Sequence, residues 1–99
     1  MIELTDDSLK QFVQEGDCVL FYYTDGCPMC PTVRKILAAL GDIRSAQLCY
    51  EQCPESVRLC RVPGVPTVLT LRDGAVRESL PGFRPKEQYA KLMEGLANG

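Results

Sequence analysis

Two cysteines separated by two residues, Cys27 and Cys30, carry the clearest chemical signal in this 99-residue sequence. Cys27 lies between an apolar run at residues 18–23, typical of a buried strand, and a helical pattern that starts at Pro28, and Cys30 falls in the first turn of that helix. Unpaired N–H groups and the positive end of the dipole at a helix N-terminus stabilise a thiolate, which is the species that attacks disulfides. We therefore expect Cys27 to be an exposed nucleophile and Cys30 to be a more buried thiol that resolves the mixed disulfide.

The same pair of cysteines also fits other kinds of site. A Cys-x-x-Cys pair can supply half of a structural zinc site, which needs two more ligands. The sequence contains no histidine, so these ligands would have to come from Cys49, Cys53 or Cys60. A redox role is favoured over a metal site because the pair lies beside a β-α-β pattern. A non-catalytic interaction domain that keeps the motif is a further alternative.

The elements that must hold this pair follow from the spacing of apolar residues. Short apolar or β-branched runs predict five strands, at residues 2–4, 18–23, 46–50, 65–71 and 75–79. Repeats at three and four residues predict four helices, between Thr5 and Gly16, from Pro28 to Gly41, at residues 54–61 and from Pro85 onward. The order β-α-β-α-β-α-β-β-α predicts an α/β fold, with a central mixed five-stranded sheet flanked by four helices.

Length and composition narrow the function further. A chain of 99 residues with 45% apolar and 24% charged residues is expected to form one domain over residues 1–99. Its net charge of −2 gives no electrostatic reason to bind nucleic acid or an anionic membrane surface. No apolar run is long enough to span a bilayer, and the acidic N-terminus lacks the pattern of a signal peptide. We therefore expect a cytoplasmic monomer with no nucleic-acid or membrane partner.

Over nearly its whole length the sequence resembles the thioredoxin family. The strand followed by Cys27-Pro28-Met29-Cys30 matches the order of strand and motif in that family. Pro66 falls where the family has a cis-proline facing the active-site disulfide, Gly74 falls at the family's hairpin, and Gly82 falls at a glycine that lines the substrate groove. The N-terminal strand and helix, which glutaredoxins lack, are predicted as well. The resemblance implies the thioredoxin fold.

The resemblance also implies an activity and its partners. The implied activity is that of a thiol–disulfide oxidoreductase that acts on protein disulfides. The implied electron donor is an NADPH-dependent thioredoxin reductase or another dithiol donor, and no bound cofactor or metal is expected. A proline directly after the first cysteine is closer to glutaredoxins, so a glutathione-linked enzyme is the alternative. We expect the substrate groove to be lined by Gly26, Pro28, Met29, Val65, Pro66 and Gly82.

Three positions depart from the family pattern. Gly26 stands where the family has the tryptophan before its first cysteine. Phe21 replaces the family's buried aspartate, and Gln47 replaces the lysine that partners it. The resemblance therefore implies an atypical thioredoxin whose second thiol lacks the usual proton acceptor. Water, Asp25 or Glu51 could take that proton instead.

The remaining cysteines allow several interpretations. Cys53 and Cys60 match a second pair that animal thioredoxins carry around the same short helix, where the pair is read as regulatory. Seven residues along a helix span about 10 Å, too far for a disulfide unless Cys53 precedes the helix. Cys49 could pair with Cys53, or all three could be free buried thiols. Cys18 is expected to be a core residue.

Overall fold

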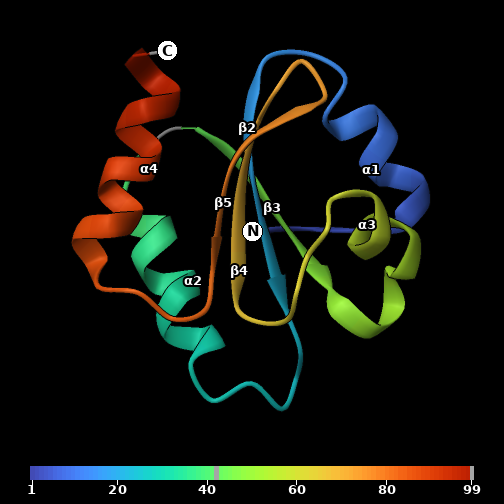
Figure 1. Cartoon of the computed structure of the whole chain (residues 1–99), viewed down its shortest axis with the longest axis horizontal. Coiled ribbons are helices and arrows are strands. Elements are labelled where there is room, and N and C mark those ends of the chain that lie inside the picture. Colours follow the sequence, from blue (N-terminus) through green and yellow to red (C-terminus); the bar gives the residue numbers. More distant parts are fainter. Residues whose placement is uncertain (42, 99) are drawn as a thin grey trace.

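A buried central strand organises the sheet. The computed structural model describes residues 1–41 and 43–98, and its five strands form one mixed sheet with the order β1-β3-β2-β4-β5 (Figure 1). The strands are β1 (Ile2–Leu4), β2 (Asp17–Tyr23), β3 (Arg44–Cys49), β4 (Thr67–Arg72) and β5 (Ala75–Pro81). β2 pairs in parallel with β3 and antiparallel with β4. Residues 18–22 of β2 are fully buried, which confirms the expected two-sided burial.

Helices cover both faces of this sheet. They are α1 (Asp6–Phe12), α2 (Cys30–Ala39), α3 (Pro54–Leu59) and α4 (Lys86–Asn98), with a short 3-10 helix η1 (Tyr50–Gln52) before α3. Figure 1 shows α2 and α4 on one face and α1 and α3 on the other. Alternate residues of β2 serve the two cores: Leu20 and Tyr22 face α1 and α3, whereas Val19 and Phe21 face α2 and α4. The predicted mixed five-stranded sheet with four helices is confirmed, and no helix of the described residues could span a membrane.

The start of α2 differs from the prediction. The helix begins at Cys30, and Pro28 and Met29 form a turn before it. A helix starting at Pro28 would require residue 31 to donate its N–H to the carbonyl of Cys27, and Pro31 has no N–H. Pro31 instead occupies the first turn of α2, where a missing N–H is tolerated. The prediction that Pro28 opens the helix was therefore wrong.

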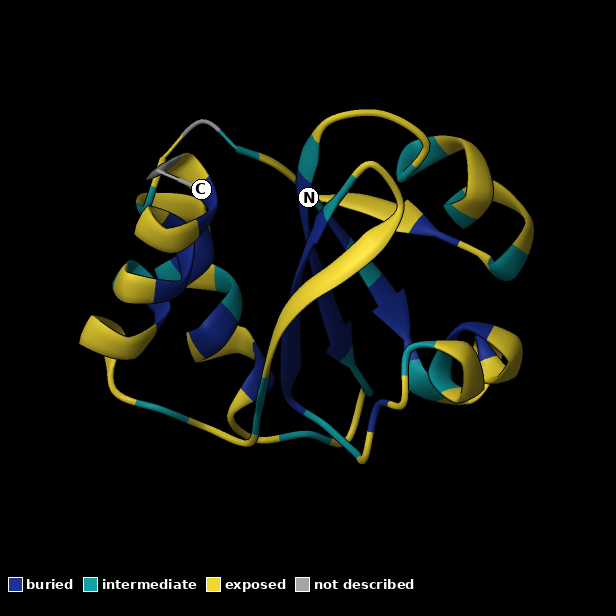
Figure 2. Cartoon of the chain, turned by 45° about the horizontal axis from the view of Figure 1, so that its top comes forward, coloured by how far each residue is buried: buried dark blue, intermediate teal, exposed yellow. Residues whose placement is uncertain are grey.

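The β4–β5 hairpin is tight and its outer strand is exposed. Asp73 (φ 50°) and Gly74 (φ 84°) both adopt the left-handed conformation that a two-residue hairpin turn requires. Thr70 pairs with Glu78 and Leu71 with Val76, so Arg77 is an extra residue that makes a bulge in β5. Figure 2 shows most of β5 as exposed, in contrast to the buried strands beside it.

Helix α3 is capped by a residue distant in sequence. Its N-cap residue, Cys53, provides no side-chain cap. The carboxylate of Asp6, in the first turn of α1, accepts hydrogen bonds from the N–H groups of Glu55 (3.2 Å) and Ser56 (2.9 Å). The Ser56 hydroxyl is in turn hydrogen-bonded to the hydroxyl of Tyr22 in β2. These contacts fix α3 to both α1 and the central strand.

Candidate active site

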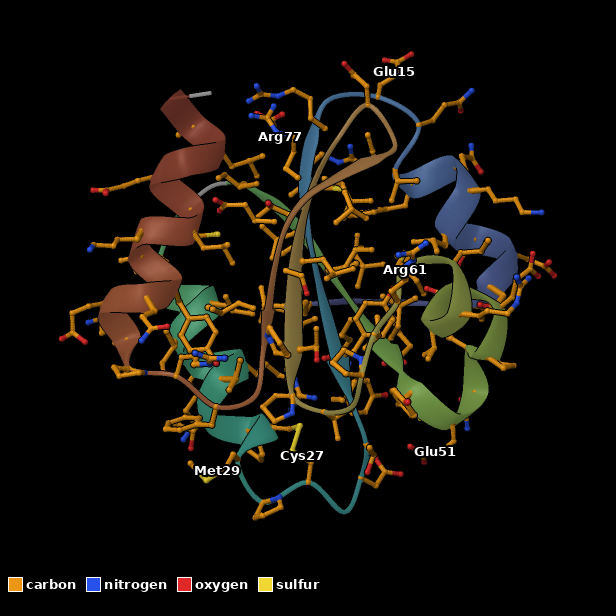
Figure 3. The ribbon with its side chains drawn as sticks, viewed as in Figure 1. Glu15, Cys27, Met29, Glu51, Arg61 and Arg77 are labelled. Carbon is orange, nitrogen blue, oxygen red and sulfur yellow. A yellow bond between two sulfur atoms is a disulfide. The ribbon has the colours of Figure 1, made fainter. Side chains whose placement is uncertain are left out.

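The loop between β2 and α2 is held by its own backbone. The Thr24 hydroxyl accepts a hydrogen bond from the N–H of Gly26 (3.1 Å), and the Thr24 carbonyl accepts one from the N–H of Cys27 (3.3 Å). The Cys27 carbonyl accepts a hydrogen bond from the N–H of Cys30 (3.3 Å), which leads directly into α2. This local chain of bonds places Cys27 where β2 has ended, at the lower end of the sheet in Figure 3.

Cys27 and Cys30 form a disulfide with a Cα–Cα distance of 5.4 Å. Their surroundings differ: Cys30 is only 2% exposed and belongs to the core beneath α2, whereas Cys27 is half-buried and packs against the edge of that core. Cys27 is therefore the more accessible residue of the pair. This arrangement suits a dithiol in which one cysteine attacks and the other resolves.

A proline loop lies at the same end of the sheet as Cys27. The Val65–Pro66 peptide bond is cis, as the resemblance implied. The Pro66 carbonyl accepts a hydrogen bond from the N–H of Gly82 (2.7 Å), and this bond ties the start of β4 to the segment after β5. Val65 packs against the same core cluster as Cys27. The structure thus brings Val65, Pro66 and Gly82 to the end of the sheet that carries the disulfide.

The rim of the site is exposed and partly apolar. Gly26, Pro28 and Met29 are exposed, with Met29 at 37%. A side chain at Gly26 would have room, because the nearest atom to its Cβ position is the Thr24 hydroxyl at 3.9 Å. Sequence reasoning missed Phe83, which is 44% exposed and directly follows Gly82. An aromatic residue in a short polar segment beside a groove glycine was the available signal.

Behind the disulfide, the side chain of Phe21 is fully buried where the family has a carboxylate. The residue of β3 that pairs with Phe21 is Gln47, whose Oε1 accepts a hydrogen bond from Nε of Arg34 in α2 (2.8 Å). The Arg34 guanidinium lies over the rings of Phe21 (5.5 Å) and Tyr23 (5.2 Å). Sequence reasoning also missed Arg34, since nothing in its local pattern distinguishes it from a solvent-facing helix residue.

A carboxylate completes this network on the outer strand. Glu3 accepts hydrogen bonds from the Tyr23 hydroxyl (2.8 and 2.9 Å) and from Nε2 of Gln47 (2.7 Å). Burial, followed by the nearby Glu3 carboxylate, raises the pKa of Tyr23 to about 12. Tyr23 is therefore protonated at neutral pH and is no base for a thiol.

Glu51 and Asp25, suggested above as proton acceptors, have other surroundings than the buried Cys30. The Glu51 carboxylate accepts a hydrogen bond from the Cys49 thiol (3.8 Å), and Figure 3 shows Glu51 well apart from Cys27. Asp25 is exposed in the turn that follows β2. Among the described residues, neither carboxylate forms a hydrogen bond with Cys30, which is almost fully covered.

The other four cysteines, Cys18, Cys49, Cys53 and Cys60, are free thiols. Cys53 immediately precedes α3 and Cys60 immediately follows it. Cys53 therefore lies before the helix, as a disulfide between the two cysteines would require. Burial raises the pKa of the Cys53 thiol, which disfavours its thiolate. A second redox pair at Cys53 and Cys60 stays a prediction. Among the residues that the structure describes, no group of three or more Cys, Asp or Glu side chains is arranged to hold a metal ion.

Comparisons with known proteins agree with this geometry. The family model described as Thioredoxin matches residues 1–95. The thioredoxin of Listeria monocytogenes is 29% identical over 96 residues, which cover 92% of this chain and 93% of that protein. The thioredoxin of Bacillus subtilis is 28% identical over 98 residues, with 94% of each chain covered. A mutant thioredoxin from Halobacterium salinarum has a similar fold, with a TM-score of 0.79, 20% identity and coverage of 96% of this chain and 88% of its own.

Proposed function

The chain belongs to the thioredoxin family and is a thiol–disulfide oxidoreductase, and we propose that it reduces disulfides of protein substrates through Cys27 and Cys30. The observation that supports these roles is the unequal burial of the two bonded cysteines: Cys27 is half-buried, whereas Cys30 is only 2% exposed. A substrate sulfur can approach Cys27 from solvent, whereas Cys30 is reached only from Cys27. The accessible cysteine is therefore the nucleophile.

The proposed reaction has two exchange steps. In the reduced protein, the Cys27 thiolate attacks one sulfur of a client disulfide, the client S–S bond breaks, and the second client sulfur leaves as a thiolate. The Cys30 thiolate then attacks Sγ of Cys27 and releases the first client sulfur. The client gains two electrons and two protons overall, and Cys27 and Cys30 are left as the disulfide seen here.

We propose that the client chain lies along the surface formed by Met29, Val65, Pro66, Gly82 and Phe83. Met29 and Phe83 offer exposed apolar side chains on this surface. Because the Pro66 carbonyl is already bonded to Gly82, the backbone of Val65 would be the part of the loop that pairs with an extended client strand. Gly26 and Pro28 would form the solvent-facing rim.

We further propose that the protein works in the cytoplasm and takes part in electron transport and redox homeostasis there. Four of its six cysteines are free thiols, which is typical of a reducing compartment. A thioredoxin reductase that uses NADPH, or another dithiol donor, would supply electrons to the Cys27–Cys30 disulfide. The two sulfurs hold both electrons, so the cycle requires no bound cofactor.

An insulin-reduction assay with dithiothreitol as the donor tests this proposal. Wild-type protein should accelerate insulin precipitation, and Cys27→Ser should reduce the rate to that of dithiothreitol alone. Cys30→Ser that has been reduced and then freed of dithiothreitol should keep the attacking thiol and accumulate a mixed disulfide with insulin, visible as a non-reducing gel shift. A wild-type rate no higher than that of Cys27→Ser would contradict the proposed reductase activity.

A further inference from the structure

A row of side chains on the α2 face of the sheet joins three strands beneath the active site. Glu3 in β1 is paired with Gln47 in β3, and Gln47 is paired with Phe21 in β2, so the three side chains point to the same face. Tyr23, two residues after Phe21, points to that face as well. Arg34 reaches down onto this row from α2.

The guanidinium of Arg34 is held in place on this row. Its Nε donates to Oε1 of Gln47 at 2.8 Å, and its Cζ lies 5.5 and 5.2 Å from the ring centroids of Phe21 and Tyr23. Two aromatic faces and an amide oxygen are favourable partners for a cation that is partly removed from water. The Glu3 carboxylate accepts hydrogen bonds from the Tyr23 hydroxyl and from Nε2 of the Gln47 amide. Within the described residues, it forms no ion pair with Arg34.

Arg34 is also close to the resolving thiol along the helix. Cys30 and Arg34 are four residues apart in α2, and residues at this spacing have Cβ atoms about 5–6 Å apart on one helix face. Cys30 and Phe21, the ring beneath Arg34, belong to the same buried core. A charge acting across such a core is screened less than one acting through water.

We infer that Arg34 is a positioning residue for disulfide exchange, whose fixed positive charge stabilises the thiolate of Cys30. This inference rests on the function proposed above. The Cys30 thiol must lose its proton before Cys30 attacks Sγ of Cys27. That proton passes through solvent to the departing client thiolate. A cation beside Cys30 favours that ionised state without a carboxylate base. The charge at this site thus has the opposite sign to the family's aspartate, and it acts on the thiolate directly.

Arg84 is a second cation near this core: it lies beside Tyr89, and its Nε donates to the carbonyl of Pro81 (2.9 Å). The remaining ionisable groups near this core do not stabilise a thiolate. Tyr89 of α4 lies in the same core, and burial raises the pKa of its hydroxyl, as it does for Tyr23. Both phenols are therefore neutral at pH 7. Glu3 has the wrong sign to stabilise a thiolate, and Gln47 separates it from Arg34.

The reduction potential of the Cys27–Cys30 pair, measured in glutathione redox buffers, tests this inference. Arg34→Met keeps the length of the side chain and removes its charge. The loss should destabilise the reduced form, shift the exchange equilibrium about three- to tenfold toward the disulfide, and make the potential about 15–30 mV more negative. The thiolate absorbance at 240 nm should also titrate at higher pH in this variant. Arg34→Lys should recover most of both changes because it restores the charge.

Arg44 provides a matched control. Its guanidinium also lies over an aromatic ring, that of Phe12 at 4.3 Å, and it also donates hydrogen bonds, to backbone carbonyls of Phe12 and Glu15. Arg44 begins β3 at the end of the sheet opposite the disulfide, so Arg44→Met removes the same charge at a distance. The reduction potential of the Cys27–Cys30 pair in Arg44→Met should equal that of the wild type.

Two results would overturn the inference. Equal potentials in Arg34→Met and Arg44→Met would remove any special role for Arg34. A potential of Arg34→Lys equal to that of Arg34→Met would show that packing, and not charge, is responsible. Circular dichroism of each variant in both redox states checks that the fold is kept. Wild-type protein that fails to exchange with glutathione buffers would overturn the proposed function itself, which separates that failure from failure of the Arg34 role.

Discussion

Identical thiol groups acquire different properties from their surroundings in this protein. Cys27 is half-buried after an exposed turn, and Cys30 is covered by the core under α2. Cys53 is equally covered, but burial raises the pKa of its thiol and its Sγ donates a hydrogen bond to the carbonyl of Leu4. Residue type alone therefore does not decide which cysteine reacts. Position at the end of β2, beside a cationic side chain, distinguishes the pair that does.

The family's buried carboxylate cannot simply be restored at position 21. Phe21 is fully buried and supports the guanidinium of Arg34. Phe21→Asp would remove a ring from the core and bury an acid in its place, and should lower the free energy of unfolding by about 3–5 kcal/mol. Phe83→Asp, at a ring that is 44% exposed, should cost less than about 1 kcal/mol. Urea denaturation measures both, and equal costs would contradict the importance of the buried ring.

A buried hydroxyl pair couples the central strand to α3. The hydroxyls of Tyr22 and Ser56 are hydrogen-bonded, and both residues are at most 1% exposed. Ser56→Ala should lower the free energy of unfolding by about 1–2 kcal/mol because it removes a buried partner of the phenol. In the double variant Tyr22→Phe/Ser56→Ala, the cost should be smaller than the sum of the single costs. Strict additivity in chemical denaturation would argue against the coupling.

The elements themselves could be predicted from apolar spacing, but their boundaries could not. The two-sided burial of β2 and the Asp73-Gly74 turn follow from local sequence, and both are confirmed. The start of α2 depended on which of two prolines entered the helix, and Pro31 decided it. Contacts such as that of Asp6 with α3 join residues about fifty positions apart. These contacts depend on how α1 and α3 pack, so no local sequence pattern predicts them.

Asp6 should matter more for α3 than for its own helix. Its carboxylate accepts hydrogen bonds from two N–H groups at the start of α3, and the N-cap residue of α3 makes no side-chain capping hydrogen bond. Asp6→Ala should therefore lower the free energy of unfolding by about 0.5–2 kcal/mol and speed amide hydrogen exchange in α3. Asp7→Ala removes a neighbouring acid from the same first turn of α1 and is the matched control. Similar effects of both changes on α3 exchange would mean that α1, not the cap, is responsible.

At the scale of the whole molecule, the active site is assembled from several parts of the chain. β1, β2, β3 and α2 meet in the network of Glu3, Tyr23, Gln47 and Arg34. The cysteine pair could be predicted because its spacing is local, and the cis bond before Pro66 was implied only by the family resemblance. The network could not be predicted, because it requires the register of three strands, and that register is known only from the folded sheet.

One ion pair makes stability depend on pH at the end of the sheet far from the disulfide. Asp17 in β2 pairs with Arg72 in β4, and Arg72 also donates to the carbonyl of Leu96 in α4. The hydrogen bond from Arg72 holds the pKa of Asp17 below its usual value of 3.8. Because the folded state favours the ionised acid, this pair stabilises the fold above that value and loses its effect as pH falls through the folded pKa.

The urea midpoint of Asp17→Asn should therefore lie below that of the wild type at pH 7. The gap should narrow once the pH drops under about 4 and close at still lower pH, where both proteins carry a neutral side chain. Asp25→Asn, in an exposed turn, controls for the loss of one negative charge. A gap that stays constant from pH 7 to pH 2 would show that the ion pair is not its source.

The two outer strands have a consequence for behaviour at high concentration. β1 has only three residues, and β5 carries the bulge at Arg77, an exposed charge at Glu78 and a proline at its end. Short, bulged or charged edges are poor templates for a strand from another molecule. The sheet is therefore protected against edge-to-edge aggregation, and a concentrated solution of the reduced protein should stay free of fibrils.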